Sequence, residues 1–189
     1  MRKIWLSMAL LASLNALAED APWLTEARKV ASQVPPKLLQ VLSEEIAKDG
    51  PAVAMGVCRD KAPLMAKAAS EQTGWTIKRV SLQNRNPKAV PDAWERAALE
   101  EFDRRAAAGE SPATLEKSDA VTTDAGRTEY RYMKALPVQQ LCLACHGKAE
   151  TLAPEVNEKL HSLYPDDKAV GYTLGQIRGA MTIRKTLPN

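Results

Sequence analysis

Three residues in the C-terminal third of the chain, Cys142, Cys145 and His146, could together bind a metal cofactor, because they have the spacing Cys-x-x-Cys-His. This spacing is the attachment signature of c-type haem. Each thiol can bond to one vinyl group of the porphyrin, and the adjacent imidazole then reaches the iron as an axial ligand. The sequence therefore predicts one covalent haem c, attached through Cys142 and Cys145 and ligated by His146.

A Cys-x-x-Cys pair has two other uses, as a redox dithiol or as half of a zinc site. Zinc would need a second pair of cysteines, and the chain has three cysteines in all. A thioredoxin-like dithiol favours a strand before the motif, a helix after it and an aromatic residue beside the first Cys, whereas Gln140 and Leu141 stand there. Haem is favoured, and both alternatives remain open.

The sixth ligand of the iron decides what such a haem can do. His161 is expected on the surface, because it lies about one residue off the apolar stripe of its helix. Cys58 is the cysteine left over once two are bound to haem, and a leftover cysteine in an exported protein needs an explanation. Cys58 is therefore the favoured ligand, although it could be a small buried hydrophobe. An open site stays possible, as do four methionines that core packing already explains, Met55, Met65, Met133 and Met181.

The first 18 residues have the pattern of a cleaved secretory signal. Arg2 and Lys3 precede a mostly apolar stretch from Ile4 to Leu17, and small residues lead up to Ala18. The stretch has about fourteen residues, fewer than the ~20 needed to cross a bilayer. We therefore expect residues 1–18 to be a signal peptide and the mature protein to be periplasmic. This location agrees with the motif, because bacteria attach c-type haem outside the cytoplasm.

Composition excludes some partners. The chain has 26 Lys and Arg against 23 Asp and Glu, and the predicted signal removes two of these cations, so the mature protein is nearly neutral. This balance gives no bulk attraction for nucleic acid. Since no second long apolar stretch follows, we expect no stable membrane insertion after signal cleavage. The expected partner is an unidentified redox or signalling protein.

Helical spacing of apolar residues alternates with strand-like runs, which predicts a single α+β domain with a mostly antiparallel sheet. We divide it into an N-terminal helical segment, 19–50, and a haem domain, 51–189. Pro35 and Pro36 should kink or break the first helix. Asp92 and Glu95 have the spacing of a capping box, Gly74 is a helix stop signal, and the strands 115–122 and 127–136 suggest a hairpin. The predicted helices are 23–48, 60–72, 92–108 and 154–163, and the predicted strands are 52–58, 75–82, 115–122, 127–136 and 179–187.

The predicted strand 52–58 alternates in residue size. Small residues occupy the face that ends in Cys58, which would let a flat macrocycle approach the backbone. Two arginines, Arg79 and Arg85, carry guanidinium groups that suit carboxylates such as haem propionates. Bracing of a loop is an equally good interpretation of both arginines.

Several segments resemble one known family, the exported monohaem cytochromes first characterised in a thermophilic cyanobacterium, whose domain also occurs as the sensor module of histidine kinases. The resemblance spans nearly the whole mature chain. It implies a PAS-like fold and an unusual His/Cys-ligated haem, with His146 and Cys58 as the axial ligands. The loop after Arg85 departs from the usual family pattern. The segments are 58–66, 78–81, 85–87, 91–95, 142–147 and 171–180.

Three functions are compatible with this reading. The first is redox sensing or signalling, in which the oxidation state controls ligation by Cys58. The second is simple periplasmic electron transfer with unchanging ligands. Enzymatic turnover is disfavoured, because a filled sixth position blocks substrate and His161 is the only other histidine available for acid–base work. We therefore expect no enzymatic activity.

Overall fold

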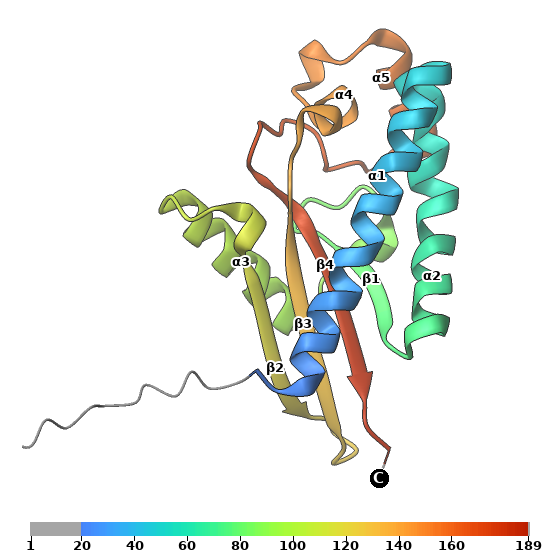
Figure 1. Ribbon diagram of the computed structural model, residues 1–189. Coiled ribbons are helices and arrows are strands. Elements are labelled where there is room, and N and C mark those ends of the chain that lie inside the picture. The colour runs from blue at the N-terminus through green and yellow to red at the C-terminus, as the bar shows by residue number, and fades with distance from the viewer. Residues whose placement is uncertain (1–19, 189) are drawn as a thin grey trace, which may run out of the picture.

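The computed structural model describes residues 20–188, and the predicted signal peptide 1–18 lies outside them. Helices and an antiparallel sheet form one α+β domain that begins with a long helix, as predicted (Figure 1). The elements are α1 (Pro22–Gly56), a π-helical turn η1 (Val57–Lys61), α2 (Ala62–Thr73), β1 (Thr76–Val80), α3 (Ala93–Ala107), β2 (Glu116–Thr122), β3 (Thr128–Pro137), α4 (Leu143–His146), α5 (Pro154–Leu163) and β4 (Ile177–Thr186).

Within residues 20–188 the sheet has four strands in the order β1-β4-β3-β2, and every neighbouring pair is antiparallel. The predicted hairpin is confirmed: β2 pairs with β3 through a turn around Gly126, whose φ of 72° favours glycine. The last strand, β4, lies between β1 and β3. Consequently β1 and β3 end, and β4 begins, at the same end of the sheet.

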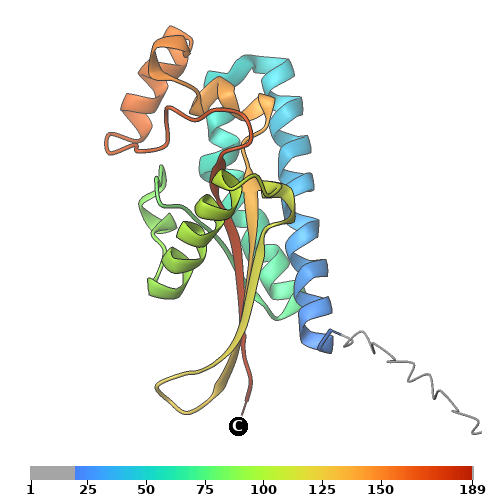
Figure 2. The same cartoon turned by 90° about the vertical axis from the view of Figure 1, so that its left-hand side faces the viewer.

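Helices cover both faces of the sheet, with α1 and α2 on one side and α3 on the other (Figure 2). One buried cluster joins the first half of α1 to the sheet and includes Trp75, Tyr132 and Ile183. A second cluster joins α3 to the opposite face and includes Phe102 and Met133. Burying these large side chains is the main source of stability, at about 1.5–3 kcal/mol for each of them.

The first helix corrects two predictions. Pro35 and Pro36 do not break it, since only Gly50, with φ 82° and ψ 169°, has non-helical dihedrals within α1. The buried residues Ala31 and Val34 hold that stretch against the sheet, and such packing outweighs the missing proline hydrogen bonds. The predicted strand 52–58 is also wrong, because the chain there is helical.

A short apolar run has the same pattern in a strand and in a buried helix, so the sequence alone could not separate the two at 52–58. Gly50 interrupts the helix, and Pro51 then opens a new helical stretch, a position that proline favours. The division of the chain at Gly50 into two segments stays a prediction, and α1 runs across that point.

Other helix boundaries follow their predicted signals. Asp92 and Glu95 form the predicted capping box of α3, in which each side chain accepts from the other residue's amide. Gly74 ends α2 with a left-handed φ of 71°. The predicted helix 154–163 matches α5 residue for residue.

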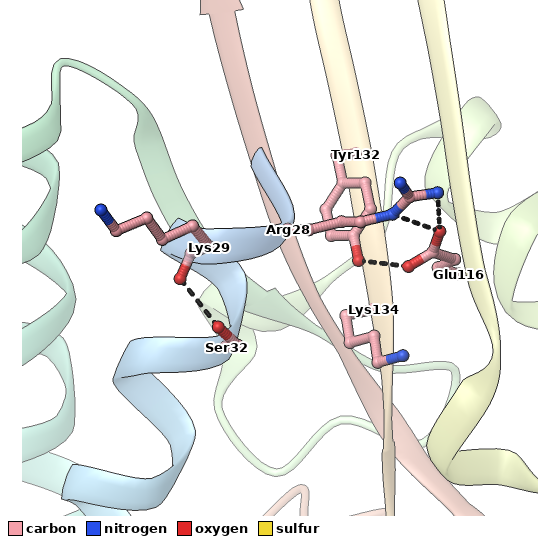
Figure 3. Close-up of a pocket in the computed structure, with 6 residues that line it drawn as sticks. All are labelled: Arg28, Lys29, Ser32, Glu116, Tyr132 and Lys134. Atoms are coloured by element: carbon pink, nitrogen blue, oxygen red, sulfur yellow. Dashed lines mark hydrogen bonds and ion pairs between the residues drawn. The ribbon is translucent and has the colours of Figure 1, made fainter. Parts of the chain in front are cut away.

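Polar contacts fix α1 across the edge of the sheet, around a pocket of about 340 Å³ (Figure 3). Arg28 of α1 lies 2.7 Å from the carboxylate of Glu116 on β2, and the hydroxyl of Tyr132 on β3 donates to the same carboxylate over 2.8 Å. These groups satisfy one another's hydrogen bonds and charges, so we interpret the pocket as a structural contact that fixes α1 to the sheet.

In the part of the chain that the structure describes, no helix is both long enough and apolar enough to span a bilayer.

Candidate functional site

The Cys-x-x-Cys-His motif lies where β3 leaves the sheet, at the end where β1 also stops (Figure 1). A 3₁₀ turn, Gln140–Cys142, leads directly into α4, so Cys142, Cys145 and His146 share one short helical stretch. Gly147 ends that stretch, and a Cβ there would lie 2.7 Å from the carbonyl oxygen of Leu143. Only glycine lets the chain turn away directly after the histidine.

The imidazole of His146 is held in one orientation. Its Nδ1 lies 2.7 Å from the carbonyl oxygen of Ala169, and because a carbonyl only accepts, Nδ1 carries the proton. The lone pair is then on Nε2, which is the atom a metal would bind. Burial, with the charges of Arg178 and Arg85, holds the pKa of His146 well below its usual value, so the ring is neutral at pH 7.

Arg85 braces the loops on both sides of the motif. Its guanidinium donates to the carbonyl oxygens of Cys145 (2.6 Å) and Ala169 (3.3 Å), and it pairs with the Asp167 carboxylate at 2.9 Å. Both side chains of this pair are about nine-tenths buried. Of the two interpretations open for Arg85, its protein partners support bracing of a loop.

Arg178, at the start of β4, lies against the histidine ring. Its Nε is 3.2 Å from Nδ1 and 3.4 Å from Nε2 of His146, so the guanidinium lies close to both ring nitrogens. Its Nη1 donates to the hydroxyl of Ser81 and the carbonyl of Gln83, both at 3.0 Å. Burial, together with the neighbouring charge of Arg79, lowers the pKa of Arg178 to about 9.

Gly179 lets β4 approach β1 closely beside this arginine. Its φ is 146°, and a Cβ there would lie 2.3 Å from the carbonyl oxygen of Val80. A larger residue would push Arg178 and Ser81 apart. The Arg-Gly-Ala sequence at 178–180 therefore has a packing reason.

Cys58 lies in the π-helical turn between α1 and α2, at the same end of the molecule (Figure 1). Pro51, one helical stretch earlier, has its carbonyl oxygen 3.8 Å from the Cys145 sulfur. The charges of Arg79, Arg85 and Arg178 act on the Cys58 thiol, as does Cys142. The structure thus brings Cys58 near the motif, about 84 residues away in sequence. Turns of this π-helical kind are frequent at functional sites.

The environment of Cys58 is a recess open to solvent. Its side chain is exposed, yet burial by the surrounding protein raises its pKa against the opposing effect of the arginines. Arg79 combines the same two properties, since it is exposed while surrounding protein lowers its pKa. A group that touches water while protein surrounds it lines a concave surface. Cys58 and Arg79 therefore line a recess, and the charge of Arg79 acts on both Cys58 and His146.

The two motif thiols lie against different clusters. Cys145 packs with Met55 and α5, whereas Cys142 packs with Val138 and Tyr172. Burial raises the pKa of Cys145 to about 11, so this sulfur is a thiol at neutral pH. Within residues 20–188 no cluster of three or more His, Cys, Asp or Glu side chains is arranged to hold a bare metal ion.

The other candidate ligands lie elsewhere. His161 is exposed on α5. Met133 and Met181 belong to the two sheet clusters, Met55 is buried in the cluster around α5, and Met65 is partly buried on α2. Met55 was expected on a strand face and is instead helical.

Sequence reasoning missed two groups around His146. The carbonyl of Ala169 left no signal, because any residue supplies a carbonyl. Arg178 did leave one signal, because a charged residue directly before the apolar run 179–181 needs polar partners if it is buried. No role for Arg178 was predicted from this signal.

By fold and site, the protein is an α+β domain that carries a short Cys-x-x-Cys-His helix beside an antiparallel sheet. A family model, Tll0287-like, matches residues 10–185, and the chain belongs to this family. Among solved structures it is similar to that of the cyanobacterial heme-protein Tll0287, with a TM-score of 0.65 and 24% identity over 90% of this chain and 98% of the other. This likeness confirms the fold. No curated protein matches the chain.

Proposed function

We propose that this protein is an exported, periplasmic c-type cytochrome with one covalent haem. Cys142 and Cys145 would hold the group through thioether bonds, and His146 and Cys58 would bind its iron. The observation that carries the proposal is the convergence of these four residues, from two distant segments, on one recess with Nε2 of His146 unprotonated. Membership of a family that includes a heme-protein supports it.

The residues present fit such a group. Two thiols and an imidazole share one helical stretch, a carbonyl fixes the tautomer of the imidazole, and a thiol lies across the recess. When bound, the haem supplies a one-electron redox couple. The chain supplies a strongly donating sulfur, a neutral imidazole and the buried arginines that orient them. The family resemblance also supports a PAS-like classification of the domain.

We infer that the biological role is redox sensing or signalling, and the π-helical turn η1 supports this inference. Thiolate suits ferric iron and is held less well by ferrous iron, so Cys58 is the ligand that can be released or protonated. Release would free the turn between α1 and α2, giving the two-state element that a switch needs. A signalling protein is then the expected partner.

Simple electron transfer is the second candidate. Its support is the openness of the recess, because exposed Cys58 and Arg79 leave a path for a redox partner protein to approach. We propose neither enzymatic activity nor nucleic-acid binding, and no stable membrane insertion after removal of residues 1–18.

The first experiment asks whether haem is covalently bound. The full chain is expressed with the c-type maturation machinery, then analysed by pyridine haemochrome assay and intact mass. We expect one haem per chain in the wild type and no covalent haem in a variant with both Cys142→Ala and Cys145→Ala. A wild-type mass equal to that of the bare polypeptide would overturn the proposal.

The second experiment tests the ligands by low-temperature EPR of the ferric protein. We expect the compressed g-tensor of low-spin thiolate ligation, lost in Cys58→Ser. His161→Ala, which alters the only other histidine, is the matched control and should leave the spectrum unchanged. Redox titration separates the two roles: a ligand change on reduction supports sensing, and unchanged ligation supports electron transfer. Identical ligation in wild type and Cys58→Ser would exclude Cys58 as ligand.

A further inference from the structure

Arg79 is the one arginine of the recess whose role the site leaves unexplained. It lies on β1 opposite Met181 of β4, on the same sheet face as Ile77. That face is covered by α1 and α2 further along the sheet. The two helices do not cover Arg79, so its side chain is exposed to solvent at the recess. The surrounding protein still lowers its pKa.

Within residues 20–188, Arg79 has no ion pair, no side-chain hydrogen bond and no aromatic ring beneath its guanidinium. The other two arginines of the recess are fully engaged. Arg85 binds Asp167 and two carbonyls, and Arg178 binds Ser81 and Gln83 and lies over the Tyr172 ring at 5.3 Å. Arg79 is exposed to solvent, so its donors meet water rather than a protein acceptor and are available to an anionic ligand.

The charges of the recess are also unbalanced. Three guanidinium groups act on Cys58, whereas Asp167, a carboxylate that contacts one of them, is already paired with Arg85 and accepts from the amide of Ala169 at 2.8 Å. An anion that enters from solvent would therefore find Arg79 the unengaged guanidinium of the recess. A planar fork of donors matches a carboxylate best.

We propose that Arg79 binds a carboxylate of the haem and thereby orients the group in the recess, an inference that rests on the proposed function. Arg79 is then a binding residue, distinct from the axial ligands and from the bracing pair Arg85–Asp167. Its main chain is held on β1 next to the fully buried Val80.

Non-covalent binding tests this directly. In a background of Cys142→Ala and Cys145→Ala, the purified protein is titrated with haem and with haem dimethyl ester, whose carboxylates are blocked. We expect Arg79→Gln to weaken haem binding about tenfold, the effect of losing one charge-assisted hydrogen bond. It should leave binding of the ester unchanged. Arg79→Lys should recover much of the loss, and Arg96→Gln, a charge change on the exposed face of α3, should have no effect.

A second measurement uses the covalent holoprotein, in case the alanine background folds poorly. The midpoint potential is followed against pH in wild type, Arg79→Gln and Arg79→Lys. A guanidinium keeps a carboxylate ionised, so its removal should move the pH-dependent step of the potential to higher pH in Arg79→Gln only. The same shift should persist with Cys58→Ser, because the carboxylate, rather than the thiolate, is the proposed partner.

Equal weakening of haem and ester binding by Arg79→Gln, or no weakening of either, would overturn the inference. Disappearance of the potential shift in the Cys58→Ser background would overturn it too, by making the thiolate the partner. These failures leave the haem proposal intact, because the wild-type haemochrome assay is independent of Arg79. A wild type without haem would overturn both.

Discussion

Lys78 and Arg79 are neighbours on β1, but their side chains meet opposite environments. Lys78 faces α3, where its Nζ lies 3.1 Å from the carboxylate of the fully buried Glu95. Arg79 faces the recess, where no group of the described chain binds it. In the first environment the cation is paired with the protein's own carboxylate, and in the second it is exposed to solvent and open to a ligand. The contrast teaches that unmatched polar groups locate a binding site where pocket size does not.

The largest effect on stability is expected for Glu95, the buried partner of Lys78. Its carboxylate also accepts from Thr182 at 3.0 Å and lies 3.6 Å from Arg131, so three strands depend on it. Glu95→Ala leaves two cations without their shared partner, and we expect a loss of about 3–5 kcal/mol in the free energy of unfolding, measured by urea denaturation. Glu100→Ala, exposed on the same helix, should change stability by less than about 0.5 kcal/mol.

Gly179 of β4 packs against Val80, the residue after Arg79 on β1. Its substitution tests how much this close approach contributes to stability. Gly179→Ala places a Cβ against the carbonyl of Val80 and forces a φ that alanine avoids. We expect a loss of about 3 kcal/mol. Gly126→Ala is the matched control, because it has positive φ with open space around it and should lose only about 1 kcal/mol. Equal losses in the two variants would show that the close approach is unimportant.

The comparison is sharpened by changing the two neighbours in the same way. Lys78→Gln removes a partner of Glu95 and should destabilise the haem-free protein by about 1–2 kcal/mol. Arg79→Gln removes no contact, so the haem-free protein should be as stable as the wild type or more so. Thermal and urea unfolding of both variants provide the measurement, and a larger loss in Arg79→Gln would contradict the contrast.

The smallest expected effect concerns pH and Asp92. Burial alone would raise the pKa of this carboxyl, but the Glu95 amide and the Arg131 guanidinium hold it below its usual value. A depressed pKa adds stability above the ordinary carboxyl pKa, and this stability is lost as pH falls through the lower, folded value. Asp92→Asn keeps the helix cap and removes the charge. Because Asp92 is 38% exposed, the variant should lose less than about 1 kcal/mol at pH 7.

The control for this pH effect is internal to the titration. Wild type and Asp92→Asn should approach equal stability in acid, where the wild-type carboxyl is protonated. A constant difference between them across the whole pH range would point to the cap instead of the charge.

Local signals in the sequence were sufficient for much of the fold. The capping box of α3, the glycine after α2 and the turn of the β2–β3 hairpin each act over a few residues, and each was predicted. The error at 52–58 arose because Gly50 and Pro51 interrupt a helix that then resumes. Tertiary packing stabilises the helix at 52–58 and keeps α1 helical through Pro35 and Pro36. Local sequence patterns do not contain information on such packing.

The site divides in the same way. The motif residues are adjacent, so their spacing predicted their chemistry, and the leftover cysteine drew attention to Cys58. Its proximity to them depends on how α1, α2 and α4 meet at one end of the sheet. Arg178 and the carbonyl of Ala169 come from the last third of the chain, and their contact with His146 exists only in three dimensions.

The partner that orients His146 is a main-chain oxygen, which no side-chain substitution can delete. Residue identity at position 169 would therefore carry little trace of this duty across related chains. Mutation of Asp167 can test this contact, because its carboxylate accepts from the amide of Ala169 and pairs with Arg85. A change at Asp167 would reach the imidazole through the backbone, two residues removed from the atom concerned.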